Sequence, residues 1–234
     1  APLRGIWGTG RDNVWAAGWR GVILHYDGTA WTPASHEAGE SVFFEAVWGS
    51  SPSDVHVAGQ AGVILHYDGT EWTARESGTD AALYALWGSS ATDIYAGGAG
   101  LILHWDGTAW TETDTGTEIP PHITGIWGSS PSDIFAVGYE GIILRYDGTA
   151  WTKMSSGTET HLFGVWGSSP SEVLAVGSLG TILRFDGREW TRMSPGTEEF
   201  IPFLETVWGT SSDNVYAAGA FGTLLHFDGR EWKT

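Results

Sequence analysis

The chain has 234 residues and a formal net charge of −17 at pH 7, because 28 acidic residues stand against 11 basic ones. This charge repels phosphate backbones and excludes nucleic acid as a partner. The absence of cysteine excludes disulfides and thiolate metal sites, and no apolar run approaches the roughly 20 residues that a membrane-spanning helix needs.

The tryptophans mark an internal repeat. A Trp-Gly pair recurs at intervals of 41, 39, 40, 39 and 42 residues, and a second tryptophan follows an Asp-Gly pair in each interval. The sequence therefore divides into six repeats, roughly 1–41, 42–80, 81–120, 121–159, 160–200 and 201–234. The first set is Trp7, Trp48, Trp87, Trp127, Trp166 and Trp208, and the second is Trp31, Trp72, Trp110, Trp151, Trp190 and Trp232.

Each repeat predicts four short strands in chain order. In the fifth repeat they are "HLFGVWG", "EVLAVG", "TILRFDG" and "EWTRM", each rich in β-branched and aromatic residues. The link after the first strand has the Ser, Pro and acidic residues of a turn, and the Asp-Gly pair after the third predicts a tight hairpin. The same four segments recur from "LRGIWG" to "EWKT", and no segment shows sustained helical periodicity.

Four strands in a period near 40 residues predict an all-β protein, a six-bladed β-propeller of four antiparallel strands per blade that forms one domain over residues 1–234. One blade cannot bury both its faces, so each copy covers its neighbour, and six copies can close into a ring. The sequence allows two assignments of the strands to blades, called frames here. In the favoured frame every blade is one repeat, and in the alternative "LRGIWG" is the outer strand of the sixth blade.

The first strand of each repeat has the pattern of an innermost strand. Small residues stand two positions before most Trp-Gly pairs, and Ile, Val or Leu stands directly before each pair, on the opposite face. Because a buried indole removes roughly 150–250 Å² from water, the twelve repeated tryptophans are expected to be structural core rather than ligand platforms.

The run "DVHVAGQAGVILHYDGTEW" at 54–72 resembles the repeat of Asp-box (BNR-type) propellers, especially the photosystem-assembly-factor type. There is also some likeness to bacterial propeller lectins. The resemblance implies that the Asp-Gly hairpin is a folding element on the face away from ligands, although the hairpin is shorter here than the usual box. Its aspartates are Asp27, Asp68, Asp106, Asp147, Asp186 and Asp228.

Equivalent histidines on the third strands suggest a ring of metal ligands, but at that radius they diverge far beyond the roughly 2 Å bonds of a metal site. We instead expect each to be a local partner of the hairpin Asp two residues later, and we expect no metal and no cofactor. The set is His25, His66, His104 and His226, with Arg145 and Arg184 completing it.

The positions where the repeats differ are the candidate binding residues, because loops on a rigid frame commonly bind ligands. The hairpin between the second and third strands holds a variable pair: Trp19-Arg20, Gln60-Ala61, Gly98-Ala99, Tyr139-Glu140, Ser178-Leu179 and Ala220-Phe221. The position three before Trp-Gly and the loops between repeats, such as "PGTEEFIP", vary too. All are expected at one end of the propeller, and the candidates are Arg4, Trp19, Arg20, Glu45, Gln60, Tyr84, Tyr139, Glu140, Glu205 and Phe221.

The function expected from these features is non-catalytic recognition. Aromatic tips flanked by polar groups favour a carbohydrate or surface glycan by a small margin over a protein partner. An engineered ring without a ligand is a further alternative. A sialidase-like hydrolase, with Tyr84 beside Glu45 or Glu205, is disfavoured because few arginines remain for a central site. The composition and the start at "APLRGIWG" favour a processed, secreted bacterial domain at the cell surface, and we expect a monomer.

Overall fold

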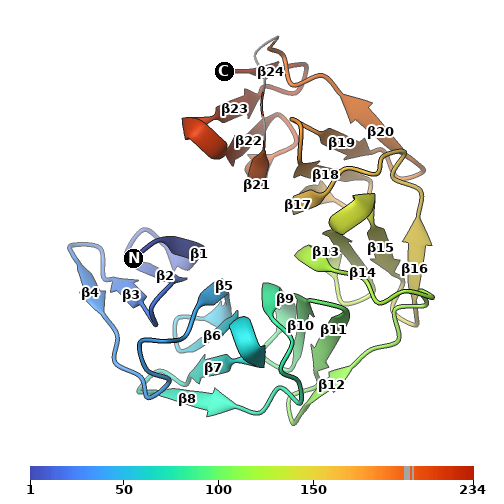
Figure 1. Ribbon diagram of the computed structural model, residues 1–234. Helices are drawn as coiled ribbons and strands as arrows, with labels where there is room; N and C mark the ends of the chain where they lie inside the picture. The colour runs from blue at the N-terminus through green and yellow to red at the C-terminus, as the bar shows by residue number, and fades with distance from the viewer. Residues whose placement is uncertain (198–200, 202) are drawn as a thin grey trace. The chain divides into compact units, whose positions relative to one another are not determined.

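The computed structural model describes residues 1–197, 201 and 203–234 and contains six four-stranded antiparallel sheets. In every sheet the strands lie side by side in sequence order, and each sheet is built from one repeat (Figure 1). The chain forms two compact units, Ala1–Thr113 and Asp114–Thr234. Each unit contains three of these sheets, called blades here.

Unit 1 contains blades 1 to 3. Blade 1 is β1 (Leu3–Gly10), β2 (Asn13–Gly18), β3 (Ile23–Tyr26) and β4 (Trp31–Pro33); blade 2 is β5 (Phe44–Ser51), β6 (Asp54–Gly59), β7 (Ile64–Tyr67) and β8 (Trp72–Arg75); blade 3 is β9 (Leu83–Ser90), β10 (Asp93–Gly98), β11 (Leu101–Trp105) and β12 (Trp110–Glu112). A single 3-10 turn, η1 (Gln60–Gly62), joins β6 to β7. The first strands β1, β5 and β9 pack in succession.

Unit 2 contains blades 4 to 6. Blade 4 is β13 (Ile123–Ser130), β14 (Asp133–Gly138), β15 (Ile143–Tyr146) and β16 (Trp151–Met154); blade 5 is β17 (Leu162–Ser169), β18 (Glu172–Gly177), β19 (Ile182–Phe185) and β20 (Trp190–Met193); blade 6 is β21 (Leu204–Ser211), β22 (Asn214–Gly219), β23 (Leu224–Phe227) and β24 (Trp232–Lys233). The 3-10 turns η2 (Tyr139–Gly141) and η3 (Ala220–Gly222) join second to third strands. Here β13, β17 and β21 pack in succession.

The fold class is the one that the sequence predicted, an all-β six-bladed β-propeller with four antiparallel strands per blade. The favoured strand frame is confirmed and the alternative is wrong, because β1 pairs with β2 inside the first blade. Closure of the ring and a single domain over the whole chain stay predictions. Within the described residues, no helix is long and apolar enough to cross a membrane.

The hydrophobic core lies between successive blades of a unit. In unit 1, Trp15 and Ile23 of blade 1 pack against Phe44 and Val57 of blade 2. Equivalent layers join blades 2 and 3, blades 4 and 5, and blades 5 and 6. Because β-strands alternate faces, one strand supplies apolar side chains to the layers on both sides of its blade. Each blade therefore covers its neighbour in the same unit, as the repeat predicted.

The repeated tryptophans divide into two structural types. Five of the outer set are buried, with relative exposures of 1–7% for Trp72, Trp110, Trp151, Trp190 and Trp232. The inner tryptophans from Trp7 to Trp166 are half-buried. Their indoles lie against glycines of the next blade so closely that a Cβ there would come within 2.6–2.8 Å of the ring, as at Gly49, Gly88, Gly167 and Gly209. The expectation that all twelve form the core is therefore wrong for Trp31 and Trp208, which are 45% and 60% exposed. Both belong to terminal repeats of the sequence.

Candidate functional site

The end of each blade that carries the hairpin between second and third strands is called the tip end. A glycine ends the second strand, and the residue after it donates its backbone N–H. The acceptor is the carbonyl of the residue directly before the first strand of the same blade. This bond occurs in all six blades with N···O distances of 2.8–3.1 Å, for Trp19 to Pro2, Gln60 to Phe43, Ala99 to Ala82, Tyr139 to His122, Ser178 to His161 and Ala220 to Phe203. The tip and the beginning of the inner strand therefore meet, as the variable positions predicted.

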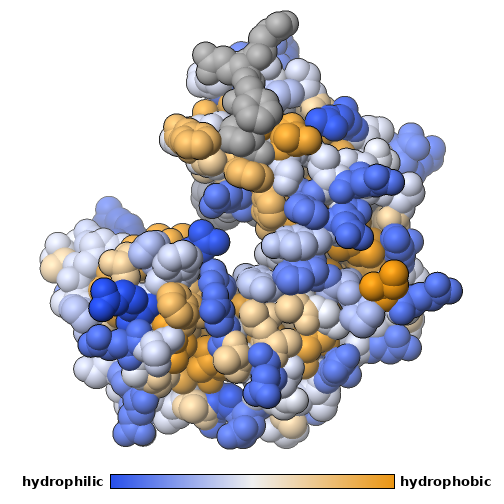
Figure 2. Space-filling model, in the orientation of Figure 1, coloured by the Kyte–Doolittle hydropathy of each residue, from blue (hydrophilic) through white to orange (hydrophobic). Residues whose placement is uncertain are grey.

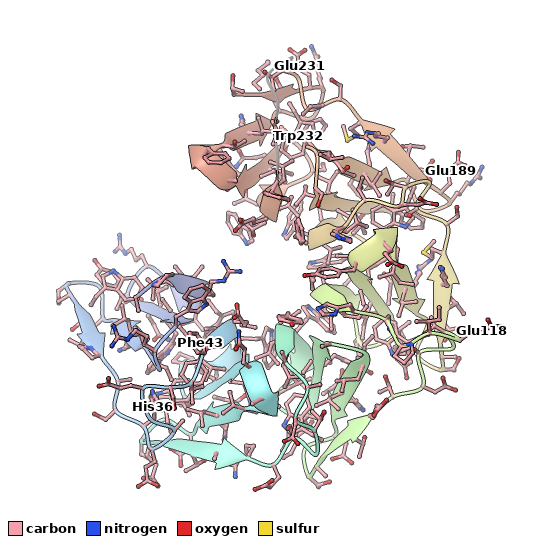
Figure 3. All side chains as sticks on the ribbon, viewed as in Figure 1. His36, Phe43, Glu118, Glu189, Glu231 and Trp232 are labelled. Carbon is pink, nitrogen blue, oxygen red and sulfur yellow. The ribbon has the colours of Figure 1, made fainter. Side chains whose placement is uncertain are left out.

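The loop between blades also packs against the tip of the preceding blade. Gly21 N donates to the carbonyl of Val42 at 2.7 Å, and His36 Nε2 lies 2.6 Å from the carbonyl oxygen of Gly21. His36 and Phe43 are labelled in Figure 3 on this part of unit 1. The three kinds of variable segment thus share one end of the blade. In the loop "PGTEEFIP", residues 198–200 and 202 lie outside the described residues.

The second tip residue adopts the left-handed backbone conformation. Five non-glycine residues have φ of 56–61°, namely Arg20, Ala61, Glu140, Leu179 and Phe221. This region costs an L-residue roughly 1–2 kcal/mol, so the surrounding hydrogen bonds impose it. Blade 3 differs from the predicted pairing because its hairpin is one residue shorter. Gly98 belongs to β10, and Gly100 takes the left-handed position with φ of 89°.

The most developed tip in unit 2 is a stack of Tyr139 between two histidines. The Tyr139 ring lies 4.2 Å from the His122 ring at an angle of 12°, and 4.4 Å from the His161 ring at 25°. Phe163 on β17 meets Tyr139 and Phe203 edge to face. Although these contacts hold it, Tyr139 is 40% exposed. The partly exposed Tyr139 ring is therefore held in one orientation between the two imidazoles.

The two histidines of this stack differ in their surroundings. His161 Nδ1 accepts the N–H of Glu140 at 3.0 Å, which a ring protonated at both nitrogens cannot do. Burial, and then the nearby His161, lower the pKa of His122. Glu140 adds an exposed carboxylate beside the stack.

The tip end of unit 1 holds a second, smaller group. Trp19, which is 38% exposed, meets Phe43 edge to face at 5.6 Å. Arg4 Nε donates to Glu45 Oε2 at 3.1 Å across the neighbouring inner strands β1 and β5. Glu45 is therefore held in an ion pair and its side chain is only 10% exposed, which makes it a poor ligand for an incoming group.

The ten candidate residues divide between the two units. Arg4, Trp19, Arg20, Glu45, Gln60 and Tyr84 belong to unit 1, and Tyr139, Glu140, Glu205 and Phe221 belong to unit 2. A single composite site that uses both groups stays a prediction. Phe221 is 95% exposed at its tip, and in Figure 2 apolar side chains stand in separate groups among polar ones.

The residues whose backbone carbonyls hold the tips were not among the candidates from the sequence. Each accepts the tip hydrogen bond through its carbonyl, at one equivalent position directly before the inner strand: Pro2, Phe43, Ala82, His122, His161 and Phe203. The signal was present, because this position varies as much as the tip pair does. What the sequence could not provide was the hydrogen bond that brings the position beside the tip.

The opposite end of each blade carries the Asp-Gly hairpin and is built for folding. Asp27 Oδ1 accepts the hydroxyl of Thr29 at 2.6 Å and the N–H groups of Thr29 and Ala30 at 2.8 and 2.9 Å. The threonine hydroxyl and then the backbone amides lower the pKa of Asp27 to about 2. Asp68, Asp106 and Asp147 repeat this arrangement, and Asp186 and Asp228 keep the two backbone bonds.

The expected partner of the third-strand histidines is wrong. Each histidine or arginine bonds the first residue of the second strand instead of the hairpin Asp, as His66 does to Asp54 and Arg145 to Asp133, both at 2.7 Å. Antiparallel register explains the difference: His66 pairs with His56, and Asp54 is two residues from His56 on the same face. The other pairs are His25–Asn13, His104–Asp93, His226–Asn214 and Arg184–Glu172.

Comparison with known proteins relates the chain to others by fold. No family model matches it, and no curated protein matches it in sequence. The structure described as YCF48 bound to D1 peptide has a TM-score of 0.78 at 18% identity, with 100% of this chain and 80% of that chain covered. YCF48 from Cyanidioschyzon merolae has a TM-score of 0.62 at 17% identity, covering 96% and 95%.

A propeller outside that group is equally similar in shape. The WD40 repeats of RRP9 have a TM-score of 0.78 at 12% identity, covering 96% of this chain and 75% of that chain. What these proteins share with the chain is the propeller fold. The photosystem assembly factor YCF48 is of the type that the repeat resembles, whereas the likeness to lectins and to the wider Asp-box proteins finds no support.

Proposed function

We propose that the chain is a non-catalytic recognition module that binds a protein or peptide segment carrying positive charge. The proposed site is the tip end of unit 2, centred on Tyr139. The observation that carries the proposal is the stack of Tyr139 between His122 and His161, because it holds a ring that is 40% exposed in one orientation. Such rigid aromatic anchors supply most of the binding energy in protein interfaces.

Charge favours a basic ligand. Glu140 at the tip, Glu159 in the adjoining loop and Glu205 on β21 are exposed carboxylates. The seven basic residues of unit 2 are elsewhere, on third and fourth strands or in Asp-Gly hairpins: Arg145, Lys153, Arg184, Arg188, Arg192, Arg230 and Lys233. The net charge of −17 adds long-range attraction for cations.

The choice of a peptide over a glycan rests on the chemistry of this tip. Phe163 contacts Tyr139 and Phe203 contacts Phe163, and neither phenylalanine side chain can form hydrogen bonds with sugar hydroxyl groups. Structural neighbours that bind a peptide, as in YCF48 bound to D1 peptide, agree with this choice. A carbohydrate ligand, which the sequence favoured by a small margin, is the alternative outcome of the test.

The test is fluorescence anisotropy with labelled peptides that contain Arg or Lys beside an aromatic residue. Controls are peptides of the same composition with Glu in place of each base. We expect binding of the basic peptides only, weakened by salt, and weakened about 30-fold by Tyr139→Ala if this residue is a hot spot. Trp31→Ala, which removes an exposed aromatic from an outer strand beside an Asp-Gly hairpin, is the control and leaves binding unchanged.

Three results would overturn the proposal. Equal binding of acidic peptides would remove the charge argument, and equal binding by the Tyr139→Ala variant would move the site elsewhere. A response on a glycan array without peptide binding would reverse the order of the two ligand classes. Turnover of a fluorogenic glycoside would contradict the non-catalytic assignment.

A further inference from the structure

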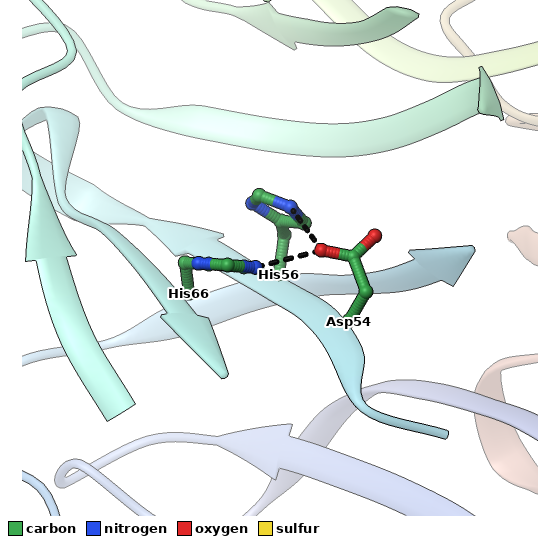
Figure 4. Close-up of side chains that lie close together, drawn as sticks. All are labelled: Asp54, His56 and His66. Atoms are coloured by element: carbon green, nitrogen blue, oxygen red, sulfur yellow. Dashed lines mark hydrogen bonds and ion pairs between the residues drawn. The ribbon is translucent and has the colours of Figure 1, made fainter. Parts of the chain in front are cut away.

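Blade 2 contains a cluster of Asp54, His56 and His66 that the proposed recognition function does not use. Asp54 and His56 lie two residues apart on β6 and therefore on one face, and His66 on β7 pairs directly with His56. The two imidazoles stack with centroids 4.5 Å apart. Asp54 Oδ1 lies 2.7 Å from His66 Nε2 and 3.6 Å from His56 Nε2 (Figure 4).

His56 is an anomaly among the blades. Its relative exposure is 2%, and neither of its ring nitrogens has a hydrogen-bond partner. The longer contact to Asp54 is beyond hydrogen-bond range. At the same register position the other blades carry an apolar or aromatic residue: Trp15, Tyr95, Phe135, Leu174 and Tyr216. Blade 2 has instead buried a polar ring beside a carboxylate, which leaves two nitrogen atoms unsatisfied.

We propose that Asp54, His56 and His66 form a binding site for a divalent transition-metal ion of the zinc class. Two imidazoles and one carboxylate are a frequent ligand set for such ions. One ligand atom from each residue lies within 4.8 Å of the others, whereas bonds of about 2.0–2.1 Å need ligand atoms about 3.3 Å apart in a tetrahedron. The distances from Asp54 Oδ1 to His66 Nε2 and His56 Nε2, 2.7 and 3.6 Å, lie on either side of that spacing.

The surroundings suit a site with one open position. The side chains of Asp54 and His66 are 19% and 15% exposed, so water can supply a fourth ligand, whereas His56 closes the inner side. The Ser50 hydroxyl donates to Asp54 Oδ2 at 2.5 Å and fixes the carboxylate. Oriented ligands of this kind bind metals more tightly than free ones.

Arg75 controls access to the site. Its Nη2 donates to His66 Nδ1 at 2.9 Å, so neutral His66 carries its proton on Nε2 and donates it to Asp54. A metal on Nε2 displaces that proton, Nδ1 takes one up, and the guanidinium must leave Nδ1. Arg75 is exposed and can turn into solvent. Its positive charge also opposes the ion, so removing Arg75 strengthens binding.

The test uses the full chain, first stripped with a chelator and then titrated with Co²⁺, whose visible spectrum reports nitrogen and oxygen coordination; Zn²⁺ then competes. We expect one equivalent of Co²⁺ per chain, a rise in Tm on adding Zn²⁺, and tighter binding by Arg75→Gln. His56→Phe abolishes the spectrum while the chain stays folded, because Phe135 occupies the equivalent position in blade 4.

Blade 3 provides a matched gain-of-function control. His104 Nε2 lies 2.7 Å from Asp93 Oδ1, as in blade 2, but Tyr95 stands where the second histidine would be. Tyr95→His is expected to raise the stoichiometry from one Co²⁺ to two. The proposal is overturned if the wild-type chain binds no Co²⁺, or if His56→Phe binds it as the wild type does, since exposed histidines elsewhere would then account for the binding.

Discussion

The two ends of a blade follow opposite rules. At the Asp-Gly end, all six blades place an aspartate in the same position, where it accepts the hydrogen bonds of its own hairpin. At the tip end, the backbone bonds repeat while the side chains differ in every blade. The contrast teaches that the repeated interactions maintain the backbone of each blade. Side chains at the tips do not make these repeated interactions, so they can vary and are available for recognition.

A large effect is expected at Gly138, where the tip backbone is crowded. A Cβ on Gly138 would lie 1.9 Å from the carbonyl oxygen of His122, the oxygen that Tyr139 N–H needs. We expect Gly138→Ala to destabilise the protein by about 3 kcal/mol, measured by urea unfolding. Gly157→Ala is the control, because no atom lies within 4 Å of its Cβ and only its positive φ of 68° opposes the change, at about 1 kcal/mol. If both variants lost the same free energy of unfolding, the close contact of Gly138 could not be the cause.

The Asp-Gly end is expected to govern stability in acid. Hydrogen bonds from the neighbouring threonine and the backbone lower the pKa of Asp27, Asp68, Asp106 and Asp147 from 3.8 to about 2. Because the folded pKa is depressed, the stabilisation is present above pH 3.8 and is lost as the pH falls through about 2.

Replacing these four aspartates by asparagine removes the titration but keeps an acceptor oxygen in each hairpin. The Tm of this variant should therefore fall less between pH 4 and pH 2 than that of the wild type. Thermal unfolding followed by circular dichroism at several pH values measures the difference. Parallel curves would show that these carboxylates do not set the acid limit.

At the tip, stability and binding should separate. Tyr139 is 40% exposed, so Tyr139→Ala should lower the free energy of unfolding by only about 1 kcal/mol while it weakens peptide binding about 30-fold. Trp190→Ala removes a buried indole and should cost about 3–5 kcal/mol. Urea unfolding and anisotropy on the same samples test this. A large stability loss for Tyr139→Ala would make the stack a folding element.

The smallest expected effect concerns the left-handed tip residue. Ala61 has a φ of 56°, a conformation that glycine adopts without strain. Ala61→Gly relieves this strain but gives the unfolded chain more freedom, so we expect a net stabilisation of about 0.5 kcal/mol. Ala58→Gly, on the adjoining strand β6, should destabilise by about 1 kcal/mol, and the opposite order in unfolding experiments would contradict the assignment.

Local sequence patterns predicted much of the fold. The spacing of tryptophans, the alternation of apolar residues and the Asp-Gly pairs led to six repeats of four strands, and the structure has these strands in that order. Side-chain partners were predicted less well. His66 was assigned to the hairpin Asp two residues away along the chain, but it bonds Asp54, twelve residues away, because strand pairing brings β6 beside β7.

The sequence by itself determined the elements of this protein, because turns and strands depend on residues that are neighbours along the chain. Tertiary structure alone decided the sites. Tyr139 lies between histidines 17 residues before it and 22 residues after it. His56 is 2% exposed, and its ring nitrogens have no hydrogen-bond partner. Contacts of this kind depend on register and burial, which no local pattern encodes.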